Sequence, residues 1–383
     1  MMSESQKEIF MGSAVILTNG CLADIEAKTA HGLIRGTRRF KITGVIDANH
    51  AGQDAGQVLD GIHRGIPVFA DMDAYMARTG HTPDYAVIGV ALSGGCLDAQ
   101  WQALTLRLLE KGISIVSGMH MILGDLPEFA RTARENNARI IDVRKHKPYD
   151  QLHFWSGKIY DMTIPRLAVL GTDCAIGKRT TSRLLVEACH ARDIRAEMIY
   201  TGQTGWLQGY PYGFILDTTI NDFVSGEIEA AIVACEQESG PDLIVVEGQS
   251  ALRNPLGPCG SEFIVSGNIK GVVLQHAPFR RYVDCAEDLY CLLPEIETEI
   301  RLVELYGSKV LAVTLNYAGG TDEELHAYRD ELERQTGIPV ILPLESSSVG
   351  ISRLVPIVQE FMAEHDRLPD TTRRSTPSGE ARA

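Results

Sequence analysis

The chain has 383 residues, which at about 100 to 200 residues per domain predicts two domains or one large elaborated domain. Hydrophobic residues make up 44% and charged residues 22%, a composition typical of a globular protein with sizeable cores. The chain carries 36 Lys and Arg against 50 Asp and Glu, for a net charge of -14. Because nucleic acids and anionic membranes attract basic surfaces, this charge argues against both as partners. It leaves room for a small anionic ligand, since backbone N–H groups and one or two cations can hold a phosphate locally.

No window reaches the ~18 apolar residues of a membrane-spanning helix, and the first ten residues lack the basic start and apolar run of a secretory signal. We therefore expect a cytoplasmic protein. The eight cysteines form no C-x-x-C pair and no Cys/His spacing typical of zinc. Free thiols in a reducing compartment, and no metal site, are the expectation.

Short apolar runs rich in Val and Ile alternate with helix-length segments, which is the pattern of βαβ units and parallel sheets. In the first half this pattern predicts strands at 14–19, 42–47, 67–70, 86–90, 114–117 and 139–143. Helices are predicted at 24–34, 97–110 and 126–135. We predict an α/β fold whose N-terminal domain, residues 1–150, is Rossmann-like.

This first domain lacks the strong dinucleotide fingerprint. Its first turn reads Thr18-Asn19-Gly20-Cys21 instead of G-x-G-x-x-G, and Asp47 at the end of the second strand is only suggestive of a ribose contact. Two interpretations stay open: a ligand at the strand ends, or a purely structural or oligomerising role.

Residues 144–165 combine basic, aromatic and proline residues without a clear period and are predicted to be a boundary segment. A second alternating series follows, with strands predicted at 166–170, 196–200, 242–246, 271–275, 310–316 and 340–343, separated by amphipathic segments such as 181–191 and 322–335. This series predicts a second α/β domain, residues 151–365, with a mostly parallel sheet. Residues 366–383 are rich in Pro, Thr, Ser and Arg and are predicted to be a disordered tail.

The most informative segment reads GTDCAIGKRTT, directly after a predicted strand and before a predicted helix. In that context glycines let the backbone curl, N–H groups point at phosphate oxygens, the helix N-terminus adds positive potential and Lys178 supplies a full charge. We predict a phosphate-binding loop (P-loop) made of Gly171, Thr172, Asp173, Cys174, Ala175, Ile176, Gly177, Lys178, Arg179, Thr180 and Thr181. The structural alternative is a chance G-K pair at an ordinary turn, which the complete glycine loop disfavours.

Two features distinguish this segment from an ordinary ATPase loop. Five residues instead of four separate Gly171 from Gly177, and Arg179 stands where Ser or Thr normally binds Mg²⁺. Thr180 and Thr181 are the candidate replacements for that hydroxyl. A weakened metal site fits a ligand that is held by its phosphates without being hydrolysed.

Two further residues with acid–base chemistry follow apolar strands. Glu247 is expected to face the phosphate loop, because ligands gather at the carboxyl ends of strands in open α/β sheets. It is a candidate Mg²⁺-binding acid or proton acceptor; the alternative is a solvated loop carboxylate. His276 can exchange a proton near neutral pH.

The candidate substrate-binding residues also lie at or near predicted strand ends: Gln203, Thr204, Gln249, Ser250 and Arg280. Small amide and hydroxyl groups suit a polar ligand, and turn chemistry is the equal alternative for Gln203 and Thr204. The same choice holds for Asp222, whose alternative is an N-cap formed by Asp222 or Asn221. Arg is the usual fork for a carboxylate, although one of Arg280 and Arg281 is expected at the surface.

The chain resembles a bacterial and archaeal family long catalogued as a domain of unknown function and associated with D-glutamate N-acetyltransferase. The resemblance rests on five segments in order and spacing: GTDCAIGKRTT, TGQTGW, DFVSGEIE, VVEGQSAL and LQHAPFR. It covers residues 166–357, and the loop is also similar to that of dethiobiotin synthetase. The resemblance, and not the composition, implies transfer of an acetyl group from acetyl-CoA to the amine of D-glutamate in D-amino-acid catabolism.

The implied chemistry is compatible with these residues. A phosphate loop can grip the phosphates of CoA without Mg²⁺-assisted hydrolysis. The amine must lose a proton before it attacks the thioester. The candidate general bases are Asp222, Glu247 and His276. Loop N–H groups or Lys178 are the candidate oxyanion donors, and Arg280, Gln203 and Thr204 the candidate partners of the substrate carboxylates.

Two rival hypotheses stay open. One is an ATP-dependent kinase or ligase that activates a small carboxylate, with Lys178 on the β- and γ-phosphates and Glu247 with Thr180 on Mg²⁺. The other is a nucleotide-binding sensor that performs no chemistry. We also expect a homo-oligomer.

Overall fold

The computed structural model describes residues 10–91, 93–345 and 350–367 and divides into two compact units. Unit 1 ends its main segment at Lys147 and also contains Gly202–Pro211 and Ile215–Thr219. Unit 2 comprises the rest of the chain from Pro148 onward. The division after Lys147 falls inside the predicted boundary segment, whereas the return of residues 202–211 and 215–219 to unit 1 was not predicted from the sequence.

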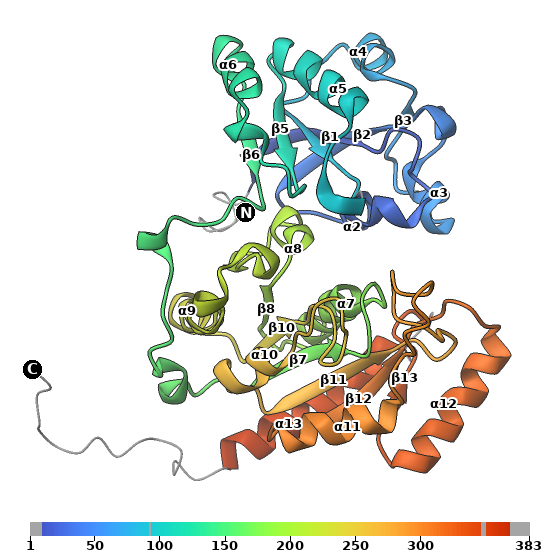
Figure 1. The fold of residues 1–383 in the computed structure, drawn as a ribbon. Coiled ribbons are helices and arrows are strands. Elements are labelled where there is room, and N and C mark those ends of the chain that lie inside the picture. Colours follow the sequence, from blue (N-terminus) through green and yellow to red (C-terminus); the bar gives the residue numbers. More distant parts are fainter. Residues whose placement is uncertain (1–9, 92, 346–349, 368–383) are drawn as a thin grey trace, which may run out of the picture. The chain divides into compact units, whose positions relative to one another are not determined.

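Unit 1 contains one sheet of six parallel strands in the order β3-β2-β1-β4-β5-β6, the order typical of a Rossmann fold (Figure 1). Its strands are β1 (Gly12–Leu17), β2 (Phe40–Ile46), β3 (Val68–Phe69), β4 (Tyr85–Ile88), β5 (Ser114–Ser117) and β6 (Ile140–Asp142). Its α-helices are α2 (Lys28–Ile34), α3 (Ala55–Asp60), α4 (Met72–Thr79), α5 (Ala99–Glu110), α6 (Pro127–Glu135) and α8 (Gln203–Leu207). Its 3-10 helices are η1 (Ile25–Ala27), η2 (Ala48–His50), η3 (Ser93–Gly95), η4 (Leu123–Asp125) and η7 (Leu216–Thr218). All six predicted strands are confirmed.

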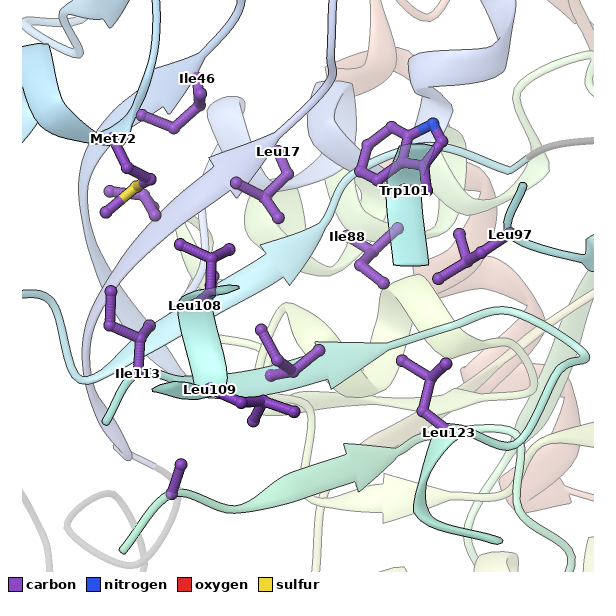
Figure 2. Packing of buried hydrophobic residues seen from close by; sticks show 14 of the residues in the cluster. Leu17, Ile46, Met72, Ile88, Leu97, Trp101, Leu108, Leu109, Ile113 and Leu123 are labelled. Atoms are coloured by element: carbon purple, nitrogen blue, oxygen red, sulfur yellow. The ribbon is translucent and has the colours of Figure 1, made fainter. Parts of the chain in front are cut away.

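The core of unit 1 follows from the alternation of side chains along β1. Val15 and Leu17 belong to one buried cluster, with Trp101 and Leu108 of α5, part of which Figure 2 shows. Ala14 and Ile16 belong to another, with the residues of α2. Because successive side chains of a strand point to opposite faces, the two clusters pack on opposite faces of the sheet. The second cluster also contains Leu207, which comes from the later segment of the chain.

Unit 2 contains one sheet of seven parallel strands in the order β13-β12-β11-β7-β10-β8-β9. Its strands are β7 (Arg166–Gly171), β8 (Ala196–Tyr200), β9 (Tyr212–Gly213), β10 (Leu243–Glu247), β11 (Gly271–His276), β12 (Lys309–Leu315) and β13 (Val340–Ile341). Its α-helices are α7 (Lys178–His190), α9 (Asn221–Ser239), α10 (Ser261–Ser266), α11 (Ile296–Leu305), α12 (Asp322–Thr336) and α13 (Leu354–Arg367). Its 3-10 helices are η5 (Tyr149–Gln151), η6 (Lys158–Asp161) and η8 (Ile351–Arg353).

The prediction for unit 2 was right for six of these strands and missed the two-residue edge strand β9. Strand β7 lies centrally, between β11 and β10, and all six of its residues are buried. The carboxyl ends of three neighbouring strands therefore meet around the segment that follows β7. Helix α13 includes the first two residues of the predicted disordered tail, and residues 368–383 lie outside the described part of the chain.

Candidate phosphate-binding site

The loop between β7 and α7 has the strand-to-helix geometry that a phosphate loop requires. The N–H of Thr172 donates to the carbonyl of Gln275 at 3.0 Å, which ties the start of the loop to β11. Gly177 is the N-cap of α7 and has a φ of 106°, in the left-handed region that favours glycine. A Cβ on Gly171 would lie only 2.8 Å from Cδ1 of Ile176. The left-handed backbone therefore favours glycine at 177, and a side chain at 171 would have to displace the end of Ile176.

Lys178 is the first residue of α7 and is only 6% exposed. Its Nζ donates to the carbonyl oxygen of Asp173 at 2.5 Å, inside the loop. Burial lowers the pKa of Lys178, and the opposing influence of Cys174, Asp173 and Glu247 is weaker. A cation is thus held among loop residues at a helix N-terminus, the arrangement that attracts phosphate.

Glu247 ends β10 beside β7 and is 2% exposed. Its Oε2 accepts a hydrogen bond from the N–H of Thr201 at 3.1 Å. Thr201 in turn donates its hydroxyl to the carbonyl of Glu247 at 2.8 Å and accepts from Nε2 of Gln249 at 3.0 Å. Because β10 pairs with β7, with Glu247 opposite Val169, this carboxylate lies at the edge of the sheet from which the loop leaves β7.

His276 ends β11 with both ring nitrogens engaged. Nδ1 lies 3.0 Å from the hydroxyl of Thr172, and Nε2 lies 3.1 Å from the hydroxyl of Tyr328, whose ring stacks on the imidazole. Burial lowers the pKa of His276 to about 4, so the ring is neutral at pH 7. Because both ring nitrogens already have partners, these contacts argue against a general-base role for His276. That role stays a prediction.

The two threonines of the loop motif differ in their surroundings. Thr181 is buried, and its hydroxyl donates to Oε1 of Gln275 at 2.6 Å, so it is used in fixing α7 to β11. Thr180 is half-buried on the first turn of α7, as is Arg179. Of the two candidate replacements for the Mg²⁺-binding hydroxyl, Thr180 is therefore the better placed.

Several residues that hold the loop were missed in the sequence. Nδ2 of Asn316, directly after β12, donates to the carbonyl of Ile176 at 2.9 Å. Gln275 also accepts from Thr314 at 2.6 Å. The available signal was a polar side chain at or just beyond the end of an apolar strand, the same signal that drew attention to Glu247 and His276.

Arg280, a candidate partner of the substrate carboxylates, instead lies on the loop. Its Nη1 donates to Oδ2 of Asp173 and to the carbonyl of Cys174, at 2.8 Å in each case. Ser250 follows β10 in a strained left-handed conformation with a φ of 37°, and its hydroxyl accepts from the thiol of Cys174 at 3.5 Å. Arg280 and Ser250 thus border the loop at the site, and their substrate contacts stay predictions.

Asp222 is exposed in the first turn of α9. The N-cap of α9 is Ile220, without a side-chain cap bond, so the alternative interpretation, an N-cap by Asp222 or Asn221, is not observed. The chain before Ile220 enters the helix without a polar side chain placed over the first N–H groups. Asp222 therefore does not cap α9.

The rest of the DFVSGEIE segment holds the boundary segment within unit 2. Glu227 accepts from the N–H and Nδ1 of His153 at 3.0 and 2.8 Å. Glu229 accepts from the N–H groups of Ser156 and Ile159 at 2.6 and 3.1 Å. A Cβ on Gly226 would collide with the carbonyl of His153. These three conspicuous residues of the segment are structural.

Gln203 and Thr204 belong to unit 1, whereas the phosphate loop belongs to unit 2. Oε1 of Gln203 accepts from Nε of Arg144 at 3.1 Å, and its Nε2 donates to Thr29 at 3.4 Å. Arg144 also forms an ion pair with Asp217, which lies in Ile215–Thr219, the other late segment of unit 1. Both candidates are buried, and their predicted substrate contact has no support from these hydrogen bonds.

The remainder of α8 is built into unit 1. Nε of Arg39 donates to the carbonyl of Trp206 at 2.6 Å, and the guanidinium lies 4.0 Å from the centre of the indole ring. Thr37 donates to the carbonyl of Leu207 at 2.7 Å, and Gln208 to that of Gly32 at 2.9 Å. The segment Gly202–Pro211 therefore packs beside α2, the helix that follows the first strand.

Asp47 is fully buried at the end of β2, and its Oδ2 accepts from the hydroxyl of Thr18 and the N–H groups of Gly20 and Leu22 at 2.7 to 3.0 Å. Burial works to raise the pKa of Asp47, but the bonds from Thr18, His50 and Leu22 outweigh it and lower that pKa. The Asp47 carboxylate, the candidate ribose contact, is already hydrogen-bonded to the turn that follows β1. Together with the packing of α8, this favours the structural interpretation of the first domain.

In the described parts of the chain, no group of three or more His, Cys, Asp or Glu side chains is arranged to hold a metal ion. Over the same residues, no helix combines the length and apolar character needed to span a bilayer.

The two sheets and the loop define an α/β protein with a Rossmann-like N-terminal domain and a P-loop C-terminal domain. Residues 153–355 match the P-loop domain, and residues 48–146 the Rossmann-like domain, of a family described as a domain of unknown function, DUF1611. The chain belongs to this family.

Two curated relatives, both named D-glutamate N-acetyltransferase, come from Pseudoalteromonas sp and Tritonibacter scottomollicae. They are 30% and 31% identical to this chain over 70% of its length and 79% of theirs. The crystal structure of a DUF1611 family protein from Anabaena variabilis is 25% identical and superposes with a TM-score of 0.79. That match covers 92% of this chain and 99% of the other, so the two-domain architecture is shared along nearly the whole length.

Proposed function

We propose that the protein is an acyltransferase that moves the acetyl group of acetyl-CoA to the amine of D-glutamate, with the phosphates of CoA held by the loop Gly171–Lys178. The names of the two curated relatives support an acetyltransferase. The observation that carries the proposal for the loop is the buried Lys178 at the start of α7, with Arg179 in place of a Mg²⁺-binding hydroxyl.

The loop chemistry suits CoA. The pyrophosphate and 3′-phosphate are anions that need N–H donors and a cation, and Lys178 with the first turn of α7 supplies both. No phosphate bond is broken in acetyl transfer, so the reaction has no need of the metal that an ATPase loop binds. The hydroxyl of Thr181 is used by Gln275, and Thr180 stands one residue later than the usual Mg²⁺-binding position. The site is therefore better equipped to hold phosphates than to hold Mg²⁺.

In the proposed reaction the amine of D-glutamate loses a proton to a general base and attacks the thioester carbonyl. The tetrahedral intermediate then expels CoA as a thiolate, which takes up a proton. With the phosphates of CoA on the loop, the pantetheine arm carries the thioester away from them. Glu247 and His276 are buried with hydrogen-bonded side chains, which favours Asp222, exposed at the start of α9, as the proposed base.

The rival with a specific observation in its favour is an ATP-dependent kinase or ligase. Glu247 at the end of β10, near Lys178, occupies the place of a Mg²⁺-binding acid in P-loop enzymes. Thr180 would then have to provide the hydroxyl, one residue later than is usual.

The test is incubation with acetyl-CoA and D-glutamate while free thiol is followed, beside an ATP-hydrolysis assay with the same acid. Stoichiometric N-acetyl-D-glutamate and CoA are expected, with Lys178→Ala lowering turnover at limiting acetyl-CoA. L-Glutamate is the substrate control, and Lys309→Ala, at an exposed lysine paired with Glu364, is the variant control. ADP formation without thiol release would support the kinase or ligase instead.

A further inference from the structure

The carboxylate of Asp173 has an unusual position inside the phosphate loop. It is fully buried, with 0% exposure, beside the place where an anionic ligand is proposed to bind. A buried carboxylate is costly unless every oxygen is paired, and one near a phosphate would also repel it. Its partners therefore decide whether the loop functions.

Four donors from three parts of unit 2 meet on this carboxylate. Oδ1 accepts from the N–H of Cys174 at 2.7 Å and from Nδ2 of Asn254 at 3.1 Å. Oδ2 accepts from Nη1 of Arg280 and from the N–H of Asp284, both at 2.8 Å. Cys174 belongs to the loop itself, Asn254 to the segment after β10, and the last two donors to the segment after β11.

The same residue also orients the lysine of the loop. The carbonyl oxygen of Asp173 accepts from Nζ of Lys178 at 2.5 Å. Arg280 donates to the Asp173 carboxylate and also to the next carbonyl along the chain, that of Cys174. The position of the Lys178 ammonium thus depends on a peptide that is held by the side chain of Asp173.

The charges around Asp173 also support a role in holding the loop. The guanidinium of Arg280 is 22% exposed, forms an ion pair with the fully buried Asp173 carboxylate at 2.8 Å and lies 4.0 Å from Oδ1 of Asp284. Neutralisation of Asp173 by Arg280 leaves the positive charge of Lys178 and the loop N–H groups available for an anion. A carboxylate that served only to close a turn would need one or two local N–H groups, and not an arginine from a residue more than a hundred positions away.

We infer that Asp173 is a positioning residue of the phosphate loop: its carboxylate joins the loop to the segments after β10 and β11 and sets the carbonyl that aims Lys178 at the phosphates. Asp173 does not touch the ligand through its side chain. The inference rests on the phosphate-binding part of the proposed function and is independent of the acetyl acceptor.

Isothermal titration calorimetry of the full chain tests this role, with CoA and ADP as separate probes. Asp173→Asn keeps the size of the side chain but turns one acceptor oxygen into a donor that faces other donors. We expect the Kd for the bound probe to rise about tenfold or more, the loss typical of a hydrogen bond to a charged group, with an unchanged number of sites. A merely structural role would lower the number of competent sites and leave their Kd unchanged.

Arg280 provides a second variant in case Asp173→Asn does not fold. Arg280→Ala is expected to weaken the probe at least as strongly, because it leaves the Asp173 charge uncompensated, and Arg280→Lys is expected to restore part of the affinity. Asp330→Asn and Arg334→Ala, at exposed ion pairs on α12, are the matched controls.

The binding results with CoA and ADP distinguish a failure of this inference from a failure of the proposed function. If the unmodified protein binds ADP but not CoA, the proposed acyl donor is wrong and the role of Asp173 is still measured with ADP. Unchanged Kd values in Asp173→Asn and Arg280→Ala would overturn the inference. Binding of neither probe by the unmodified protein would also overturn it, because the loop would then not be a phosphate site.

Discussion

Oε2 of Glu247 accepts a hydrogen bond from the backbone N–H of Thr201, which joins the ends of β10 and β8. A glutamine at position 247 can accept the same bond through its carbonyl oxygen, so Glu247→Gln removes the charge and can keep this hydrogen bond. If the loop holds CoA without a metal, the Kd for CoA is expected to stay within about threefold or to tighten, because a carboxylate near an anion has been neutralised.

The measurement for Glu247→Gln is calorimetry with CoA in the presence of a chelator and, separately, with MgATP. Tight MgATP binding in the unmodified protein that is lost in the variant would support the kinase or ligase. A CoA affinity that depends on Mg²⁺ would contradict the metal-free loop.

Asp222 gives a prediction about turnover. Asp222→Asn removes a proton acceptor at an exposed position of α9, so we expect kcat to fall about 100-fold, at the low end of general-base effects, with an unchanged KM for acetyl-CoA. Steady-state kinetics of thiol release measure both constants, and Asp330→Asn is the control. An unchanged kcat would remove Asp222 from the candidate bases.

His276 predicts a pH dependence of stability. Its pKa is about 4 in the folded chain against an ordinary 6.5, because the ring is buried. Between these values the unfolded state binds more protons, so stability falls as the pH falls from 6.5 towards 4, by up to about 1.4 kcal/mol per pH unit from this group. Urea unfolding at pH 7, 6 and 5 is expected to show a smaller fall for His276→Gln than for the unmodified protein.

His326→Gln, at a partly exposed histidine of α12, is the control for this experiment and is expected to follow the unmodified protein. Equal losses in all three proteins would mean that His276 is not the group responsible.

Gly226 gives a prediction about the boundary segment. A methyl group there would collide with the carbonyl of His153, so Gly226→Ala must displace the segment that Glu227 and Glu229 hold. Overpacking of this kind costs about 1–3 kcal/mol, which thermal unfolding detects as a lower Tm. Gly257→Ala introduces a methyl group with nothing within 4 Å and is expected to leave Tm unchanged. A similar Tm for both variants would argue against the close packing at Gly226.

The sequence predicted what depends on local pattern. Twelve strands were found from apolar runs, and the phosphate loop was found because its glycines and lysine are consecutive. Helix α9 was indicated only by the alternative of an N-cap at Asp222 or Asn221, and its bounds were not predicted, since its buried Glu227 and Glu229 interrupt the apolar period that marks a helix.

What the sequence did not reveal depends on contacts between distant positions. The pairing of Arg280 with Asp173 spans 107 residues, and an arginine after a strand looks the same whether it binds a substrate or a loop. Gln203 and Thr204 follow β8 of unit 2 at once, yet they pack in unit 1, because strand and turn patterns do not specify which sheet a short helix will cover.

The return of residues 202–211 and 215–219 to unit 1 affects how the chain can fold during synthesis. Leu207 fills part of the unit 1 core, and Arg39 and Arg144 have partners on the returning segments. A ribosome that has released only the first 147 residues has therefore produced a Rossmann-like sheet with an incomplete core. Folding of unit 1 must wait for β7, the phosphate loop and β8 to emerge, so the N-terminal domain is completed only when part of its neighbour has already been made.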